Sequence, residues 1–252
     1  MKKLLIFFAS VLLMMGLTAC QNEPIDISID DAFALMNTAI EDYLSADSVD
    51  LSYSGEYRST VHSLTDELEI KMKRMNKSSM VAIIDVTMDA DDTYQTVETH
   101  YQDGIAYYHT SGGASTDSKI KEEKTYEAFK ALYMGFIKAT LKSELVRDVS
   151  ILTSSSEITV ILELASGAIE ATLYVLPAMT YAKIASLEVT FTEKGVLKSL
   201  DVEYEGLIDS VYGVFSYHVT FNKINRYVIV PTLSSLEISD YQEADDANEA
   251  SS

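Results

Sequence analysis

The spacing of hydrophobic positions changes several times along the chain, and each change marks the start of a predicted element. Between residues 30 and 46, apolar side chains recur every three or four positions, which is the spacing of one face of an amphipathic helix. Ser28, with an acid three residues later at Asp31, supplies a capping box for this helix. From Val49 onward the period becomes two, which is typical of half-buried strands.

The alternating residues predict a run of antiparallel strands. Leu51, Tyr53 and Tyr57 share one face of the first strand. The last two strands of the run flank Asp103 and Gly104, a pair that favours a tight hairpin turn. Because short turns cannot carry a parallel crossover, the strands should form a meander. After the first strand, further strands are expected at 68–72, 80–88, 93–102 and 105–110.

The second half of the chain repeats this order of helix and then strands. A wide apolar stripe predicts a helix near 123–143, and Pro177 ends a short helix predicted at 166–176. The last residues, 239–252, are acidic and lack an apolar cluster, which predicts a disordered tail. Strands are expected at 148–153, 157–164, 186–193, 196–206, 211–223 and 226–230.

Together these elements predict an α+β protein in which helices cover one face of an antiparallel sheet. The 252 residues could form one large domain or two small ones. No linker rich in proline, glycine or serine separates the two runs of strands, so a single domain over residues 28–238 is favoured. A chain of this length can bury a core without the support of disulfides or metals.

The first twenty residues are typical of an export signal. A positive pair at residues 2–3 precedes an uncharged apolar run at 4–16, which is too short to span a membrane. The four residues after this run resemble the lipobox of bacterial lipoproteins: Leu17, Thr18, Ala19 and Cys20.

The lipobox resemblance implies that residues 1–19 are a signal peptide and that Cys20 becomes the new N-terminus. A diacylglyceryl group, with acyl chains such as palmitate, would be transferred to the Cys20 thiol, and residues 20–27 would form a short lipidated tether. An ordinary buried cysteine after a cleaved signal is the alternative. The implied location is extracytoplasmic, with a lipid holding the domain at the membrane.

Gln21, rather than aspartate, follows the cysteine. In a bacterium with two membranes this resembles an outer-membrane destination. In a bacterium with one membrane it carries no sorting meaning, and the protein would lie on the outer face of the cell membrane.

Composition argues against several partners. The chain has 39 acidic and 19 basic side chains and a formal net charge of −20, which argues against nucleic-acid binding because phosphate neutralisation needs clustered lysine and arginine. The same net charge argues against electrostatic docking on an anionic membrane. With one cysteine, no intramolecular disulfide can form. No motif identifies a protein partner.

The order of lipobox, tether, helix, meander, central helix and further strands resembles the Lol-type lipoprotein-carrier fold. Glycolipid-carrier lipoproteins of the LppX and LprG type share this fold, and a set of lipoproteins of Gram-positive bacteria is similar. The periplasmic Lol carriers are soluble and not lipidated, and the lipobox of this chain departs from them in this respect. The segments that carry the resemblance are 31–44, 53–57, 68–72, 101–107 and 200–204.

This resemblance implies a half-barrel, a large curved antiparallel sheet of about 9–11 strands with two or three helices on its concave face. In carriers, acyl chains lie between the sheet and these helices. The apolar stripe of the second predicted helix would then either pack as core or line this ligand space. The candidate ligand-lining residues are Phe129, Leu132, Tyr133, Phe136 and Ile137.

No sequence pattern typical of catalysis or metal binding occurs. The acids at 85, 89, 91 and 92 lack the glycine of a calcium loop, and residues 111–115 lack the Lys-Ser/Thr of a phosphate loop. We therefore expect no enzyme activity, no cofactor and no metal. The four histidines lie on predicted strands or strand ends, where structural roles are the default: His62, His100, His109 and His218.

Two functions of different class fit these features. The first is a membrane-tethered protein that binds a lipid or other hydrophobic ligand between sheet and helices, and it requires an apolar hollow there. The alternative is a non-catalytic surface lipoprotein that acts as a protein-interaction or envelope-structure module, and it requires a solid core and an exposed patch or sheet edge.

Overall fold

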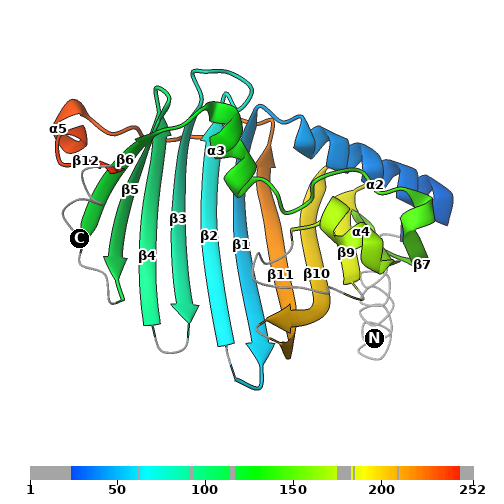
Figure 1. Cartoon of the computed structure of the whole chain (residues 1–252). Helices are drawn as coiled ribbons and strands as arrows, with labels where there is room; N and C mark the ends of the chain where they lie inside the picture. Colours follow the sequence, from blue (N-terminus) through cyan, green and yellow to red (C-terminus); the bar gives the residue numbers. More distant parts are fainter. Residues whose placement is uncertain are drawn as a thin grey trace, which may run out of the picture.

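The computed structural model describes residues 24–61, 63–90, 93–113, 117–174, 183, 185–208 and 210–244. These residues form one large curved sheet with helices across its concave face (Figure 1). The predicted fold class, α+β with a half-barrel sheet, is therefore confirmed. The sheet has 12 strands in the order β12-β6-β5-β4-β3-β2-β1-β11-β10-β9-β8-β7.

Two meanders build this sheet. They meet where β1 pairs with β11, so the first and last long strands of the domain lie side by side at its centre (Figure 1). The first meander contains β1 (Ser48–Ser59), β2 (Ser63–Lys73), β3 (Val81–Ala90), β4 (Thr93–Gln102), β5 (Ile105–Gly112) and β6 (Ser118–Glu123). The second contains β7 (Val146–Thr153), β8 (Glu157–Leu164), β9 (Ala185–Thr192), β10 (Leu197–Ile208) and β11 (Val211–Ile224).

The helix α2 (Ile29–Leu44) covers the second meander. Ser28 accepts a hydrogen bond from the Asp31 N–H, so the predicted cap at the start of this helix is present. The buried face of α2 includes Met36, Ile40 and Tyr43, and the helix contacts β7, β8, β9 and β10. The Tyr43 ring meets Phe221 of β11 edge-on, with 4.9 Å between ring centroids. Amphipathic spacing and a capping residue thus place one helix over almost half of the sheet.

The second predicted helix is much shorter than expected. Helix α3 covers Tyr126–Tyr133, and the chain then continues without helix to the short 3-10 turn η1 (Ser143–Leu145). Hydrogen bonds to a distant segment replace the helical ones. The Lys138 N–H donates to the Thr172 carbonyl, and Ile137 forms a β-bridge with Leu173. Gly135, a weak helix former, lies in the turn that follows α3.

Residues 134–138 and 172–174 therefore form a two-stranded strap across the concave face. The helix α4 (Ser166–Thr172) leads into this strap and ends earlier than the predicted boundary at 176. The Tyr174 N–H donates to the Phe136 carbonyl at 3.2 Å, which closes the strap. The apolar side chains predicted for a long helix are thus presented partly by α3 and partly by extended chain.

The strand predicted at 226–230 is absent from the sheet. Val228 and Val230 are buried against Val81, whereas Tyr227 and Ile229 are exposed. Buried and exposed side chains therefore alternate as predicted, but within the described residues no strand pairs with this segment. The segment carries the chain from the end of the central strand β11 toward the edge of the sheet formed by β6, where α5 (Ser235–Ile238) and β12 follow.

The first residues of the predicted tail are ordered. Gln242–Glu243 form β12, a short strand that pairs in parallel with β6, and Tyr241 is buried against the Tyr107 ring. The prediction of disorder from residue 239 onward is therefore wrong up to residue 244, because one aromatic residue anchors the segment to the sheet edge. β6 and β12 were not predicted, which accounts for the larger strand count.

Candidate ligand-binding site on the concave face

Burial on the concave face changes halfway along β2, β3 and β4. Near the β2–β3 turn, Ile70 and Ile84 are opposite each other and fully buried. In the next row toward the other end of the strands, Leu68, Val86 and Val97 are in register but only half-buried. Helix α3 lies over the adjacent row, in which Ala82 pairs with Tyr101, because the Phe129 and Tyr101 ring centroids are 4.4 Å apart. One continuous apolar surface thus runs from beneath α3 into a less covered region.

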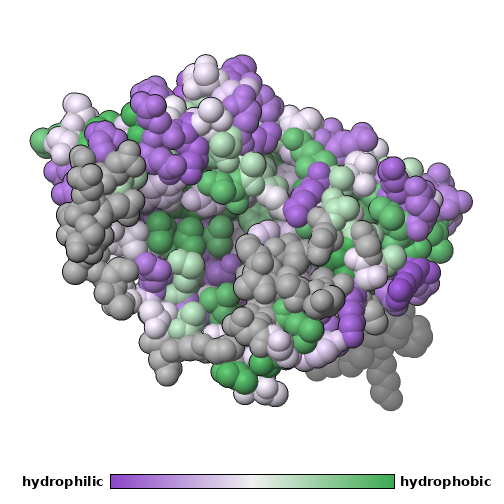
Figure 2. All heavy atoms as spheres, in the orientation of Figure 1, coloured by the Kyte–Doolittle hydropathy of each residue, from purple (hydrophilic) through white to green (hydrophobic). Residues whose placement is uncertain are grey.

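We call this less covered region the open floor. Figure 2 shows hydrophobic side chains at the bottom of a hollow on this face, over β2–β4. Exposed or half-exposed apolar side chains gathered in a concave surface are typical of ligand sites rather than of a closed core. The side chains of the open floor are Leu64, Leu68, Val86, Met88 and Val97.

One carboxylate lies among these apolar side chains. Asp66 is on β2, between Leu64 and Leu68 on the same face, and is opposite Met88 of β3. The Tyr53 hydroxyl donates to it, 3.3 Å from each carboxylate oxygen. Burial raises the pKa of Asp66, and the hydrogen bond from Tyr53 opposes that shift. In the described part of the chain no basic side chain forms an ion pair with Asp66.

An aromatic cluster closes the open floor on the side of the strap. The Tyr53 ring stacks on Phe136 of the strap, with centroids 4.9 Å apart and an interplanar angle of 22°. The buried Tyr217 hydroxyl donates to the Phe136 carbonyl at 2.8 Å. Tyr174 lies against Phe215 and Tyr217, with centroids 6.3 Å from each. Burial raises the pKa of Tyr174, and the negative charge of Asp66 raises it further.

The predicted ligand-lining residues do not form one surface. Phe129 and Ile137 are fully buried core residues, and Leu132 is 59% exposed on the outer side of α3. Tyr133 is half-buried against the Phe129 ring, and Phe136 reaches the aromatic cluster. The helical spacing failed to predict this division because the helix ends at Tyr133.

Sequence reasoning missed the open floor itself. Leu68, Val86 and Val97 have the alternating pattern of ordinary core positions, and nothing in that pattern shows that their cover ends halfway along the strands. One signal was available in Asp66, because an acid at an inward position of an alternating strand breaks the apolar face.

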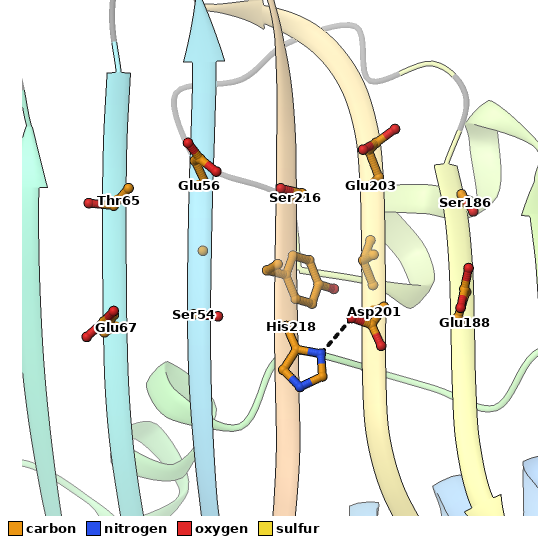
Figure 3. Close-up of a pocket in the computed structure, with 13 residues that line it drawn as sticks. Ser54, Glu56, Thr65, Glu67, Ser186, Glu188, Asp201, Glu203, Ser216 and His218 are labelled. Carbon is orange, nitrogen blue, oxygen red and sulfur yellow. Dashed lines mark hydrogen bonds and ion pairs between the residues drawn. The ribbon is translucent and has the colours of Figure 1, made fainter. Parts of the chain in front are cut away.

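A second hollow, of about 580 Å³, lies on the outer face of the sheet. Polar side chains from β2, β1, β11, β10 and β9 point to this face in Figure 3. His218 Nδ1 is 2.6 Å from Asp201 Oδ1, and both side chains are about half exposed. The hollow is strongly acidic but well solvated. Its acids are Glu56, Glu67, Glu188, Asp201 and Glu203.

The remaining described histidines also pair with acids, His100 from a buried position and His109 from a partly exposed one. His100 Nε2 is 2.6 Å from Glu98 Oε1, and His109 Nε2 is 2.7 Å from Asp117 Oδ1. Within the described ranges, no group of three or more histidine, cysteine, aspartate or glutamate side chains could hold a metal ion. None of the described helices has the length and apolar character needed to cross a membrane.

Several predicted features lie outside the described residues. These are the lipobox residues Leu17, Thr18 and Ala19, the lipidation site Cys20, and His62. The acidic pair at 91–92 and part of the segment 111–115 also fall there.

In sequence the chain matches no protein-family model and no curated protein. In structure it is similar to LprF from Mycobacterium bovis, with a TM-score of 0.42 and 9% identity over 81% of this chain and 97% of that one. It is also similar to Rv2717c from M. tuberculosis, with a TM-score of 0.26 and 8% identity over 73% of this chain and 98% of that one. Both similarities concern overall architecture only, and they transfer no residue role and no ligand to this chain.

Proposed function

We propose that this protein is a membrane-anchored, extracytoplasmic lipoprotein that binds a lipid or another hydrophobic ligand on the open floor. The observation that carries the proposal is the in-register row of Leu68, Val86 and Val97, which continues the buried core but is itself only half-buried. Apolar surface left in contact with water is costly, and a hydrophobic ligand would remove that cost.

The chemistry of the open floor suits a flexible apolar ligand. Met88 is unbranched and adapts its shape to its neighbours, which favours acyl chains of variable length. Asp66 and Tyr53 add hydrogen-bonding groups at one point of the floor. A few polar groups in an otherwise apolar site typically fix the orientation of a ligand.

The membrane anchor is the second part of the proposal, and it rests on the lipobox. A diacylglyceryl group at Cys20 supplies two acyl chains, which is enough for stable anchoring. The ligand site would then lie on the same side of the membrane as the lipid that holds the protein. A ligand could pass between the bilayer and the domain without crossing a long aqueous distance.

Native mass spectrometry, followed by organic extraction, tests ligand binding. The chain from Gln21 onward contains every described element and lacks the lipidated cysteine. We expect extra mass that resolves into acyl lipids. The variant Leu68→Asn should lose this mass, whereas Leu152→Asn, at a position 62% exposed on β7, should retain it. A bare mass, with no binding of a fluorescent fatty-acid probe, would favour the protein-interaction module instead.

A further inference from the structure

The two ends of the sheet differ in their relation to the expected anchor. The strand registers place the β2–β3, β7–β8 and β9–β10 turns and the end of β11 at one end of the sheet. The chain joins the sheet at this same end, where the Ile25 N–H donates to the Ser154 carbonyl in the β7–β8 turn at 3.0 Å. We call it the tether end.

The tether is too short to hold this end far from a bilayer. A fully extended chain spans at most about 3.3–3.6 Å per residue, so residues 20–25 reach less than about 20 Å. With acyl chains on Cys20, Ser154 would therefore stay within that distance of the membrane surface. The hydrogen bond from Ile25 holds the first described residues against the β7–β8 turn.

Basic side chains gather around one hollow at the tether end, although acids such as Asp50 and Glu157 also lie at this end. A hollow of about 340 Å³ lies between the β9–β10 turn, the end of β11 and the β7–β8 turn. Among the described residues that line it, Glu193 is the one acid. Lys223 forms a long ion pair with Asp50, at 3.9 Å. The exposed basic residues that line the hollow, which we call the basic cluster, are Lys194, Lys198, Lys223 and Arg226.

Large apolar side chains are exposed beside this cluster. Tyr227 is 82% exposed and Ile229 is 69% exposed, immediately after Arg226. Their neighbours Val228 and Val230 pack against Val81 and fix the segment to the sheet, so Tyr227 and Ile229 are held outward. Basic residues together with exposed aromatic and aliphatic residues are typical of surfaces that contact the membrane interface.

The overall charge does not oppose this contact. Charges in water interact over about 10 Å at 0.1 M salt, so acids in the middle and at the opposite end of the sheet are screened from a bilayer at the tether end. The acidic hollow of the outer face lies along the middle of the strands, around Asp201 and Glu203, rather than at this end. The net charge of −20 is therefore a poor guide to membrane binding, because the charge is unevenly distributed over the protein.

We propose that the tether end is the membrane-facing surface of the protein and that the basic cluster binds anionic lipid head groups. The inference rests on the proposed lipid anchor, and it adds an orientation. It also places an apolar groove of about 540 Å³, lined by Leu44, Met75, Tyr126 and Met134, on the side of the molecule that faces the bilayer.

Lysine acetylation of the full lipidated chain in vesicles tests this orientation. The lipid anchor keeps the amount of bound protein equal on vesicles of phosphatidylcholine and on vesicles that also contain phosphatidylglycerol. We expect acetylation at Lys194, Lys198 and Lys223 to slow by about threefold or more on the anionic vesicles, and high salt to reverse most of this effect. Lys183, exposed next to Glu205 at the opposite end of β10, should react equally on both.

A charge-reversal pair provides the matched control. The double variant Lys194→Glu and Lys198→Glu changes two exposed positions and should abolish the protection of Lys223, whereas Lys183→Glu should leave it intact. Equal rates on the two vesicle types, or protection of Lys183 in place of Lys194, would overturn the inference and leave lipid anchoring standing.

A chain without lipid, which leaves the vesicles, would contradict the proposed anchor instead. The same acetylation would then be measured on the full chain mixed with anionic vesicles. Absence of protection at the basic cluster in that experiment would overturn the inference as well, and protection there would support it independently of the anchor.

Discussion

A side chain at Gly55 would collide with Oδ1 of Asp66, the residue directly opposite it on β2. The Tyr53 hydroxyl occupies the same space, so the absence of a Cβ at this position allows the hydroxyl and the carboxylate to meet above the strand. The polar point of the open floor therefore depends on a glycine in the middle of β1, where glycine is otherwise unfavourable.

Gly55→Ala should destabilise the protein by about 1–3 kcal/mol, because the added methyl group must displace either Asp66 or Tyr53. Gly135→Ala is the control, since its nearest neighbour would be the Ala131 carbonyl oxygen at an ordinary 3.8 Å. Urea unfolding measures both. An equal effect of the two substitutions would show that the space above Gly55 is not tightly filled.

Asp66→Asn should stabilise the protein at neutral pH. Burial raises the pKa of Asp66 above its ordinary value of 3.8, so the folded state binds the proton more tightly than the unfolded state. Stability of the wild type should therefore fall as the pH rises from about 3.8 through the raised pKa, and the full cost should be present above it. The Asp66→Asn variant has no carboxylate and therefore lacks the free-energy cost of a buried negative charge.

Thermal melts of the wild type and the Asp66→Asn variant between pH 4 and pH 8 would measure this difference. The advantage of the variant should be largest at the alkaline end and shrink toward the acid end. Glu67→Gln, at the neighbouring exposed position on the outer face, should bring no such gain. A variant less stable than the wild type at pH 8 would mean that the hydrogen bond from Tyr53 outweighs burial.

Two buried tyrosines should respond differently to removal of the hydroxyl. Tyr217→Phe loses a 2.8 Å hydrogen bond to the Phe136 carbonyl and should cost about 0.5–1.5 kcal/mol. The buried Tyr57 hydroxyl has no hydrogen-bond partner in the described part of the chain, so Tyr57→Phe should be neutral or stabilising. Chemical denaturation of the two variants side by side decides the matter. A larger loss for Tyr57→Phe would indicate a partner for that hydroxyl.

Tyr241→Ala should loosen the β6 edge of the sheet. The Tyr241 ring meets Tyr107 edge-on at 5.3 Å, and the Lys119 Nζ lies 5.7 Å from its centroid. We expect a loss of about 1–3 kcal/mol, with faster amide hydrogen exchange in β6. Leu236→Ala, 81% exposed on α5, should change stability by less than about 0.5 kcal/mol. Unchanged exchange in β6 would contradict this anchoring role.

Cys20→Ser should release the protein from the membrane fraction, because the hydroxyl cannot replace the thiol as acceptor of the diacylglyceryl group. Gln21→Ser, at the next position, leaves the acceptor in place and should remain bound. Membrane fractionation with immunoblotting measures both variants. Retention of Cys20→Ser would contradict the lipoprotein prediction.

Much of the fold could be predicted from periodicity. The helix that starts after Ser28, the strands around Tyr53 and Ile84, and the hairpin at Gly104 all follow from local spacing and turn chemistry. These elements form where hydrophobic spacing, capping and turn residues agree, so neighbouring residues determine them. The α+β class and the antiparallel meanders follow directly from such elements.

Tertiary structure alone decided the features that concern function. Helix α3 ends at Tyr133 because the chain after it pairs with 172–174, a segment far away in sequence. The open floor exists because, among the described residues, burial falls between the row of Ile70 and the row of Leu68, residues whose local patterns are alike. The basic cluster joins Lys194 to Arg226 through strand register. Periodicity specifies which face a side chain takes, whereas what covers that face depends on residues distant in the chain.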